Sequence, residues 1–565
     1  MKQFVLLLAL MGITCTSIKA HDFEVANSEG VTIYYTITSS TDLTVAVTYR
    51  GSSYSEYPDE YSGSVVIPET VTYEDITYNV TSIGSYAFTN CKELTSIDLP
   101  NSISNLGDYT FFGCETLTSV HLPTQIKEIS SYCFSYCSSL AEIELPQSIV
   151  AIREYAFWYS SLKTINLHEN ITIIESCAFA SCNLEEIQIP SSVTTIADGL
   201  CQNSKSLKRV VLPNSITSIG HYAFSCCVQL EDVSIGEKVT SIGAWAFYYT
   251  AIKSITIPKN VKIIYSGAFD GSFNEDEAPL LEEVIIEDSD EPLQLLDRSN
   301  RYSEPFPYTV KTIYLGRDIR YPNDDTITYA YSTGIGSIFP LCDARNLVSL
   351  TIGNKVKNIA RWLFVFSKIT DLNIPDNVIS VGPGAFDRCT VKSVSMSNSL
   401  NSIEDYTFRM TKLESVIIPE SVISIGCNAF QSCSFLKIVS LPSHLSEIDP
   451  YAFDGCTSLS SIYSYNPTPA IIYEKTFSES TQQNAILYVP VGSYERYKNA
   501  DYWKNFLNIV EFDPTGIEGI FNDTAMSDSH NNAFYTIDGR KMEHLQRGVN
   551  IVRQSNGTVR KLMVK

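Results

Sequence analysis

A short motif recurs through most of this chain at intervals of 22 or 23 residues. At 81–100 it reads TSIGSYAFTNCKELTSIDLP, and at 217–235 it reads TSIGHYAFSCCVQLEDVSI. Most copies carry one phenylalanine, here called the marker, at Phe88, Phe111, Phe134, Phe157, Phe179, Phe224, Phe247, Phe269, Phe364, Phe386, Phe408, Phe430 and Phe453. A unit this short cannot bury an apolar face alone, so neighbouring copies must stack. The period therefore predicts a solenoid rather than a set of globular domains.

Each repeat also contains a stretch of the form L-x-x-I-x-L, such as Leu94, Ile97 and Leu99. Alternate residues of a strand face opposite sides, so the last two apolar positions point inward together and the residue between them points outward. A proline such as Pro100 then ends the strand, because it has no backbone donor. We therefore expect one short strand per repeat, and the stacked strands form a parallel sheet over a continuous core.

The recurring pattern L-x-x-I-x-L-P-x-S-V-x-x-I-G-x-x-A-F-x-x-C resembles the bacterial surface leucine-rich repeats called BspA-like. The match runs from about Val65 to Tyr463. The resemblance implies an α/β leucine-rich repeat solenoid of short parallel strands, one per repeat, with a cap at each end. Two departures stand out: Cys201 replaces a marker phenylalanine, and the register is lost between Phe269 and Phe364.

The chain is not repetitive at its ends, which suggests the following organisation. We expect a signal peptide at 1–20, an N-terminal β cap with a degenerate first repeat at 21–80, repeats at 81–465 with irregular insertions at 270–346, a C-terminal cap at 466–513, a linker at 514–534 and a small basic β-module at 535–565.

The segment 1–20 has an early lysine, a short apolar run and a small last residue, which is typical of a secretory signal. Cys15 raises the alternative of lipid attachment, although the residues before it fit such a site badly. No other segment approaches the roughly 20 apolar residues of a membrane-spanning helix. We therefore expect an exported protein found at the cell surface or outside the cell, with no membrane span.

The last segment resembles the C-terminal sorting module of the type 9 secretion route. It contains YTIDGR, GVNIV and a basic KLMVK end, and its charge is opposite to that of the rest of the chain. The alternative is a small stabilising β-module without a sorting role.

Charge and cysteines limit the possible partners. The formal net charge is -23, so nucleic acid and anionic lipid are poor partners. Cysteines recur three residues after the marker, as in Cys91 and Cys114, where other repeats have serine or threonine. We therefore predict a ladder of buried thiols rather than disulfides. No C-x-x-C pair occurs, and the seven histidines lack metal-ligand spacing.

Motifs for catalysis are absent from the sequence: there is no nucleophile elbow, no phosphate loop and no H-E-x-x-H. We expect no enzyme activity, no metal and no cofactor. Acid pairs such as Glu282 and Glu283 occupy strand positions that are polar in other repeats, which indicates a solvated face.

Two surfaces are candidates for ligand contact. The first is the outward row of strand residues, expected to comprise Asp98, His121, Glu144, Asn166, Gln188, Val211, Ser234, Thr256, Ile285, Tyr314, Thr351, Asn373, Ser395, Ile417, Ser440 and Tyr463. Within it, Val211, Ile285 and Tyr314 are apolar without a structural need, although single exposed apolar residues are common. The second is the inserted stretch, where Tyr302, Phe306 and Tyr308 either contact a ligand or hold the insertion against the repeats.

These features favour a non-catalytic recognition or adhesion module, which we expect to be a monomer and to bind a host or bacterial surface protein or a glycan. The alternative is a glycan-capture component of a polysaccharide-uptake surface, and a hydrolase is the least favoured.

Overall fold

The computed structural model describes residues 19–271, 281–296, 304–321, 341 and 344–513, and the backbone of four strands between 533 and 564. Contacts divide the chain into two units, Met1–Leu281 with Asp297–Ser299, and Glu282–Leu296 with Asn300–Lys565. The expected signal peptide, Cys15, Tyr302, most of the insertions and nearly all of the expected linker lie outside the described residues.

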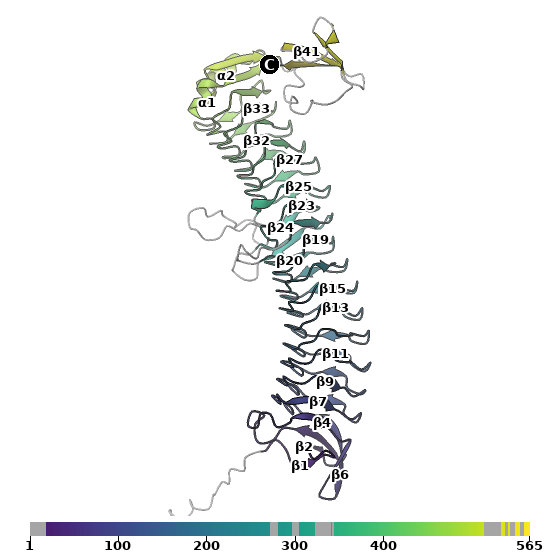
Figure 1. Ribbon diagram of the computed structural model, residues 1–565. Coiled ribbons are helices and arrows are strands. Elements are labelled where there is room, and N and C mark those ends of the chain that lie inside the picture. Colours follow the sequence, from purple (N-terminus) through teal and green to yellow (C-terminus); the bar gives the residue numbers. More distant parts are fainter. Residues whose placement is uncertain are drawn as a thin grey trace, which may run out of the picture. The chain divides into compact units, whose positions relative to one another are not determined.

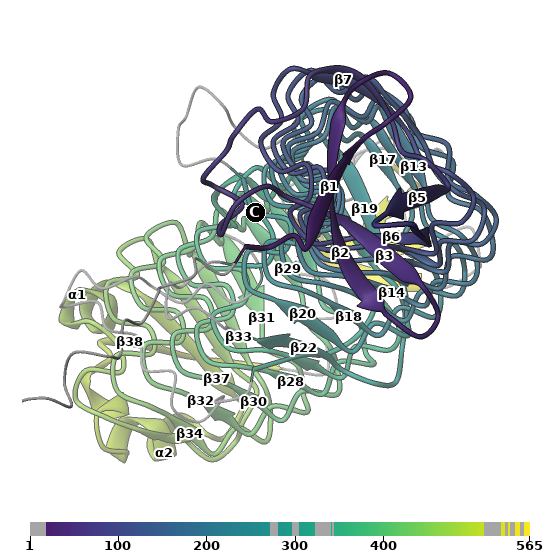
Figure 2. The same cartoon turned by 90° about the horizontal axis from the view of Figure 1, so that it is seen from below.

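The first unit begins with a sheet that is not part of the repeats. Its strands are β1 (Phe23–Ala26), β2 (Thr32–Ser39), β3 (Thr44–Thr48), β5 (Thr70–Tyr73) and β6 (Ile76–Ile83), in the order β1-β2-β3-β6-β5. β6 also pairs in parallel with β8 (Asn105–Leu106), through Ser82↔Asn105 and Ile83↔Leu106. The sheet therefore continues directly into the first repeats and lies across their open end (Figure 2).

The repeats of the first unit form two ladders of short parallel strands. The first ladder comprises β4 (Gly63–Val66), β7 (Leu94–Asp98), β9 (Ser119–His121), β13 (Glu186–Gln188), β15 (Arg209–Val211), β17 (Asp232–Val233) and β19 (Ser254–Ile257). The second comprises β8, β10 (Glu128–Ile129), β11 (Ala151–Ile152), β12 (Ile173–Ile174), β14 (Thr195–Ile196), β16 (Ser218–Ile219), β18 (Ser241–Ile242) and β20 (Ile263–Tyr265). Figure 1 shows these strands following one another repeat by repeat.

This arrangement confirms the predicted stack of repeats with short parallel strands. The expectation of one strand per repeat was incomplete, because the I-x-x-I stretch after the first strand forms a second strand of two or three residues. Registers such as Ser218↔Ser241 show that equivalent positions of successive repeats pair directly.

The marker phenylalanines form the centre of the core. All of those named above are buried, and neighbours stack: Phe111 lies 5.4 Å from Phe88 and 5.3 Å from Phe134 between ring centroids. Deep burial of rings that stack on both sides explains why this position tolerates few other residues.

The expected thiol ladder is also confirmed among the described cysteines, none of which is in a disulfide. The Sγ atom of Cys114 donates to the carbonyl oxygen of Phe88 at 3.0 Å, and Cys137 donates to Phe111 at 3.2 Å. Ser204 makes the same bond to Phe179, also at 3.0 Å. The position therefore selects a small donor that reaches the marker carbonyl of the preceding repeat.

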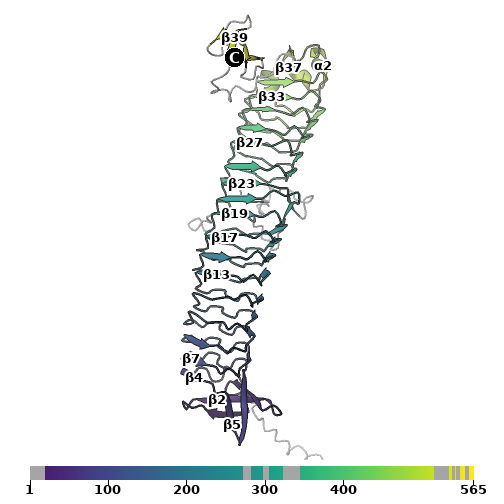
Figure 3. The ribbon, with the colours of Figure 1, turned by 90° about the vertical axis from the view of Figure 1, so that its right-hand side faces the viewer.

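The second unit contains the irregular stretch and then regular repeats. Its first ladder comprises β21 (Glu283–Ile286), β23 (Thr312–Leu315), β25 (Ser349–Ile352), β27 (Asp371–Asn373), β29 (Ser393–Ser395), β31 (Ser415–Ile417), β33 (Ile438–Leu441) and β35 (Ser461–Ser464). The second comprises β22 (Leu293–Leu296), β24 (Ile319–Arg320), β26 (Asn358–Ile359), β28 (Ser380–Val381), β30 (Ser402–Ile403), β32 (Ser424–Ile425), β34 (Glu447–Ile448) and β36 (Ile471–Ile472). The 3₁₀ helix η3 (Ala344–Asn346) precedes β25, and Figure 3 shows the first ladder edge on.

A helical segment closes the second unit. It comprises α1 (Glu479–Asn484), β37 (Ile486–Pro490), α2 (Tyr494–Asn499), the 3₁₀ helix η4 (Trp503–Asn505) and β38 (Asn508–Phe512). Phe477 stacks on the last marker, Phe453, at 5.3 Å, and Trp503 covers Phe477 while its Nε1 donates to Ala470 O at 2.7 Å. Aromatic side chains therefore cover the end of the core, as the sequence suggests for 466–513.

A separate four-stranded sheet follows, with β39 (Ala533–Thr536), β40 (Lys541–Met542), β41 (Gly548–Arg553) and β42 (Val559–Val564) in the order β40-β39-β41-β42. All its neighbouring strands are antiparallel. No helix of the described part has the length and apolar character needed to cross a membrane.

Candidate ligand-binding surfaces

The outward row of the strand face is exposed along most of both units, as its alternation predicts. Val211, Ile285 and Tyr314 are half-buried, and Ile285 pairs directly with Tyr314 across β21 and β23. Tyr314 Oη donates to Asp288 Oδ2 at 3.0 Å. Burial and this carboxylate raise the pKa of Tyr314, so its hydroxyl stays protonated.

Two members expected in this row do not line an open face. Ser440 and Tyr463 are both buried. Tyr488 stacks on Tyr463 at 4.4 Å, and the Phe512 ring meets Tyr463 edge-on at 5.8 Å. The C-terminal cap therefore covers the last part of the strand face, which a repeat pattern alone cannot indicate.

The three aromatic residues expected on the insertion have different surroundings. Tyr302 lies outside the described residues, and Tyr308 is half-buried. Phe306 is 1% exposed, so it is a core residue and is not available to a ligand. Of the two alternatives for Phe306, packing against the repeats therefore holds and ligand contact does not.

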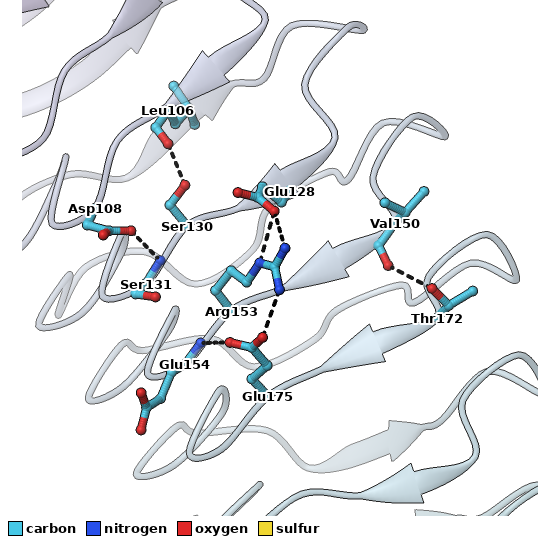
Figure 4. A network of polar contacts seen from close by, with 10 residues as sticks. All are labelled: Leu106, Asp108, Glu128, Ser130, Ser131, Val150, Arg153, Glu154, Thr172 and Glu175. Atoms are coloured by element: carbon cyan, nitrogen blue, oxygen red, sulfur yellow. Dashed lines mark hydrogen bonds and ion pairs between the residues drawn. The ribbon is translucent and has the colours of Figure 1, made fainter.

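Charged side chains on the repeats pair with equivalent positions one repeat away. Lys208 Nζ lies 3.0 Å from Glu185 Oε2, and Lys311 Nζ lies 2.6 Å from Glu282 Oε1. Near the second ladder, Arg153 bridges Glu128 and Glu175 at 2.6 and 2.8 Å, as Figure 4 shows. These exposed pairs hold neighbouring repeats in register, with a modest contribution to stability.

A third surface, which sequence reasoning missed, is the aromatic edge of the first unit. We define it as nine side chains, of which Tyr54 lies between β3 and β4 and the other eight lie on the turns around the markers: Tyr54, Tyr86, Tyr109, Phe112, Tyr132, Tyr136, Tyr155, Trp158 and Tyr159. Tyr54, Tyr136 and Tyr159 are 42%, 37% and 45% exposed, and the other six are half-buried.

Five of these rings form one continuous column. From Tyr54 through Tyr86, Tyr109 and Tyr132 to Tyr155, centroids of successive rings lie 4.3 to 4.9 Å apart and the ring planes differ by 5° to 14°. This is close face-to-face stacking, repeated once per turn. Such a column fixes each ring between its two neighbours.

A second group lies beside the column. Tyr136 and Tyr159 stack at 5.1 Å with planes 2° apart, and Trp158 meets Tyr136 and Tyr155 edge-on at 5.0 and 5.3 Å. Phe112 contacts Tyr136 at 5.4 Å in the same way. The edge is therefore one connected aromatic surface rather than scattered rings.

The backbone under these rings is unusual. Tyr109, Tyr132 and Tyr155 have φ values of 58°, 57° and 55°, in the left-handed region that disfavours side chains with a Cβ. Gly199 and Asn428 occupy the equivalent position in other repeats, with φ values of 63° and 58°. The turn can thus be built from residues suited to it, yet aromatic residues stand here in successive repeats.

Electrostatics keep the phenols of this column neutral. Burial, followed by the neighbouring Tyr109, raises the pKa of Tyr132 to about 12, with a further contribution from Glu154. A hydrogen bond with Cys177 is the main cause that raises the pKa of Tyr155 to about 12. Both hydroxyls are therefore hydrogen-bond donors and acceptors at physiological pH.

The sequence does contain a signal for this surface. A tyrosine or tryptophan stands two residues before the marker at Tyr86, Tyr109, Tyr132, Tyr155, Tyr222, Trp245, Trp362, Tyr406 and Tyr451. Because these residues recur at one fixed offset from the marker, the sequence pattern could have identified them together with the marker phenylalanines. What the sequence does not reveal is that the turn leaves most of these rings partly exposed, with Trp362 buried.

One group of metal-ligand residue types converges in the described part of the second unit. Ligand atoms of Asp405, Cys427 and Asp449 lie within 4.8 Å of one another. The Oδ1 atom of Asp405 already accepts the backbone N–H of Cys427 at 2.7 Å, and burial raises the pKa of both carboxyls. Asp405 and Cys427 share one register position and Asp449 lies one residue off it, which does not by itself make a metal site, so the absence of a metal remains a prediction.

The repeat architecture can be compared with known proteins. The BspA type leucine rich repeat region matches residues 69–184, 150–275 and 357–484, which together span more than half of the chain. The chain belongs to this family. Among curated proteins, none matches it.

Two solved structures of bacterial leucine-rich repeat proteins are similar to this chain. A leucine-rich repeat protein from Bacteroides ovatus is 25% identical, with a TM-score of 0.50, over 78% of this chain and 94% of that one. A leucine rich cell surface protein from Faecalibacterium prausnitzii is 22% identical over the same shares of each chain, with a TM-score of 0.29. The first of these supports the fold of this BspA type protein.

Proposed function

We propose that this BspA type protein is a non-catalytic recognition module that binds a partner through the aromatic edge of its first unit. Leucine-rich repeat proteins of this family are generally recognition modules, which agrees with the expected lack of enzyme activity. The observation that carries the proposal is the connected set of nine aromatic side chains, six of which stand at left-handed positions that favour glycine or asparagine: Tyr86, Tyr109, Tyr132, Tyr136, Tyr155 and Tyr159.

The backbone cost of these rings limits what they add to stability. Each left-handed tyrosine costs about 1–2 kcal/mol relative to a residue suited to that conformation. Each stacked pair returns about 0.5–1.5 kcal/mol beyond the burial of ring area. Stacking therefore offsets the backbone cost, the buried part of each ring adds stability, and the part that stays exposed is available to a partner.

The protein is proposed to act at the cell surface or outside the cell. Residues 1–20 support export, and the basic segment 535–565 supports sorting by the type 9 route. A similar protein from Faecalibacterium prausnitzii is described as a cell surface protein, which is consistent with this location. The partner would then be a host or bacterial surface protein or a glycan, and a glycan-capture role in polysaccharide uptake is the alternative.

The strand face is proposed as a second contact surface. Ile285 and Tyr314 lie side by side on adjacent strands and are half-buried, with Tyr308 half-buried in the same irregular stretch. Val211 stands at the equivalent position in the first unit and Tyr302 in the insertion. Alanine at Ile285 and Tyr314 should weaken binding at this surface and leave binding at the aromatic edge unchanged.

The test replaces three rings of the column at once, in the variant Tyr109→Asn, Tyr132→Asn and Tyr155→Asn. Asparagine is chosen because Asn428 occupies the equivalent position natively, so the backbone is retained. Arrays of matrix proteins and of glycans are probed with the full chain and with the variant. We expect the variant to lose at least about tenfold in affinity, as for removal of interface anchors.

Tyr222→Asn is the matched control. Tyr222 is also left-handed, with φ 55°, and 41% exposed, but among the described residues its ring stacks on Trp245 alone, at 5.3 Å, and it lies outside the aromatic edge. It should bind like the native protein. Unchanged binding of the triple variant to every partner of the native protein would remove the aromatic edge from the proposal.

A further inference from the structure

We propose that the aromatic edge binds polypeptide with apolar and basic side chains, and that it is not a glycan site. This inference rests on the proposed function and names the ligand class of the same surface. It follows from the way the rings are oriented, from the charges beside them and from the rigidity of the turns that carry them.

In the column, ring orientation disfavours the usual mode of sugar recognition. A pyranose ring packs its C–H groups on the open face of an aromatic ring, and needs that face free. In the column, both faces of Tyr86, Tyr109 and Tyr132 are covered by neighbours at 4.3 to 4.9 Å. The ring of Tyr49 meets the first ring, Tyr54, edge-on at 6.4 Å. The column therefore offers ring edges and hydroxyls.

Edges and hydroxyls suit protein side chains. Aromatic edges carry partial positive charge and meet other ring faces and carbonyl oxygens favourably. Tyrosine and tryptophan together supply a large amphipathic area at low entropic cost, which is why protein-binding surfaces are rich in them. The hydroxyls of Tyr132 and Tyr155 stay protonated, with their protons directed to Tyr109 and Cys177, so their oxygens can accept from ammonium, guanidinium or backbone N–H groups of a partner.

The charge beside the edge is negative. Asp108 and Glu154 are exposed at the residue before Tyr109 and Tyr155, and each contributes to the raised pKa of a tyrosine in the column. The cations nearby are neutralised: Lys92 Nζ lies 2.7 Å from Glu115, and Arg153 bridges two glutamates. With a net charge of -23 on the chain, a partner with lysine or arginine is complementary.

The edge is also rigid before it binds. The backbone N–H of Tyr109 donates to Ser131 O at 2.9 Å, and those of Tyr132 and Tyr155 donate to Glu154 O and Ser176 O at 3.0 Å each. Every left-handed turn is thus tied to the next repeat. A surface whose side chains and backbone are both fixed pays little ordering entropy when a partner docks.

The experiment probes the full chain, the triple variant and Tyr222→Asn with two arrays. One array holds synthetic peptides that combine aromatic or aliphatic residues with lysine and arginine, together with matched peptides in which the basic residues are acidic. The other holds bacterial and host glycans. Binding to selected peptides is then measured at low and high salt.

We expect basic apolar peptides to bind the native chain, more weakly at high salt, and to lose about tenfold in affinity with the triple variant but not with Tyr222→Asn. Glycan binding that the triple variant loses would overturn the inference and leave the proposed function standing. Acidic peptides that bind equally well, or an array with no bound peptide, would also overturn it. If peptides and glycans bind the native chain and the triple variant equally, the proposed function fails as well.

Discussion

Truncation of one marker, Phe224→Ala, tests the physical account of the core. Phe224 is fully buried, and its ring stacks on Phe247 at 5.5 Å on one side only, because the preceding repeat has Cys201 at the marker position. Removal of a buried phenylalanine side chain costs about 3–5 kcal/mol through lost burial and the cavity that remains. The free energy of unfolding should therefore fall by that amount.

Phe134→Ala is the matched comparison, because Phe134 stacks on Phe111 at 5.3 Å and on Phe157 at 5.5 Å. It loses one more stacked pair than Phe224→Ala, so its cost should exceed that of Phe224→Ala by about 0.5–1.5 kcal/mol. Both side chains are fully buried and the number of stacked neighbours differs, so the difference between the two costs measures the contribution of stacking to the unfolding free energy.

The measurement is denaturant unfolding combined with hydrogen exchange of individual amides. In a repeat array, destabilisation is local at first, so protection should fall around the mutated repeat while distant repeats keep theirs. Unchanged unfolding of Phe224→Ala would refute the assignment of the marker to the core. A larger cost for Phe224→Ala than for Phe134→Ala would refute the role given to stacking.

Three further predictions concern other parts of the chain. Burial raises the pKa of Cys91 to about 12, whereas the pKa of an unfolded cysteine is about 8.5. The neutral thiol therefore contributes its full stabilisation of the folded state below that unfolded pKa, and this contribution is lost as the pH rises toward 12. Native Cys91 should also resist alkylation that modifies the half-buried Cys226, and equal labelling would contradict the thiol ladder. Arg409→Ala should lower the unfolding free energy by up to about 3–5 kcal/mol, because it removes the bidentate partner, at 2.8 Å for both bonds, of the fully buried Asp387 and leaves Arg388 Nε, at 3.7 Å, as a weaker partner. A smaller cost than for the variant with alanine at both Arg409 and Asp387 would argue against this reason. Deletion of 535–565 should leave a folded protein that surface labelling of intact cells no longer detects, whereas equal labelling would rule out a sorting role.

The repeat architecture could be predicted because its determinants are local and periodic. The marker phenylalanines, the L-x-x-I-x-L stretch and the small residue after the marker recur at fixed offsets, and each occupies the buried position that its chemistry suggests. The second strand, for example Ser218–Ile219, escaped prediction because two residues are too few to show an alternating pattern.

Surface features were harder to predict, since they depend on how separate segments meet. Tyr463 occupies an outward strand position, yet Tyr488 and Phe512 from the cap bury it. Phe306 belongs to an insertion whose sequence resembles a loop, and its ring is in the core. No periodic pattern encodes such contacts, because each arises once in the chain.

The aromatic edge shows a different limit of sequence reasoning. Glycine or asparagine at a left-handed turn is explained by the backbone alone, and a buried phenylalanine is explained by packing alone. A tyrosine such as Tyr132 in the same turn has a backbone cost that its own stacking only offsets, and it leaves an edge and a hydroxyl in solvent. Gly199 and Asn428 show that the fold accepts residues suited to this conformation, while Tyr222, Tyr406 and Tyr451 show that tyrosine stands there in other repeats too. What distinguishes the column is that its tyrosines stack in successive repeats, and the role proposed for these half-buried, rigid and neutral phenols is contact with a partner.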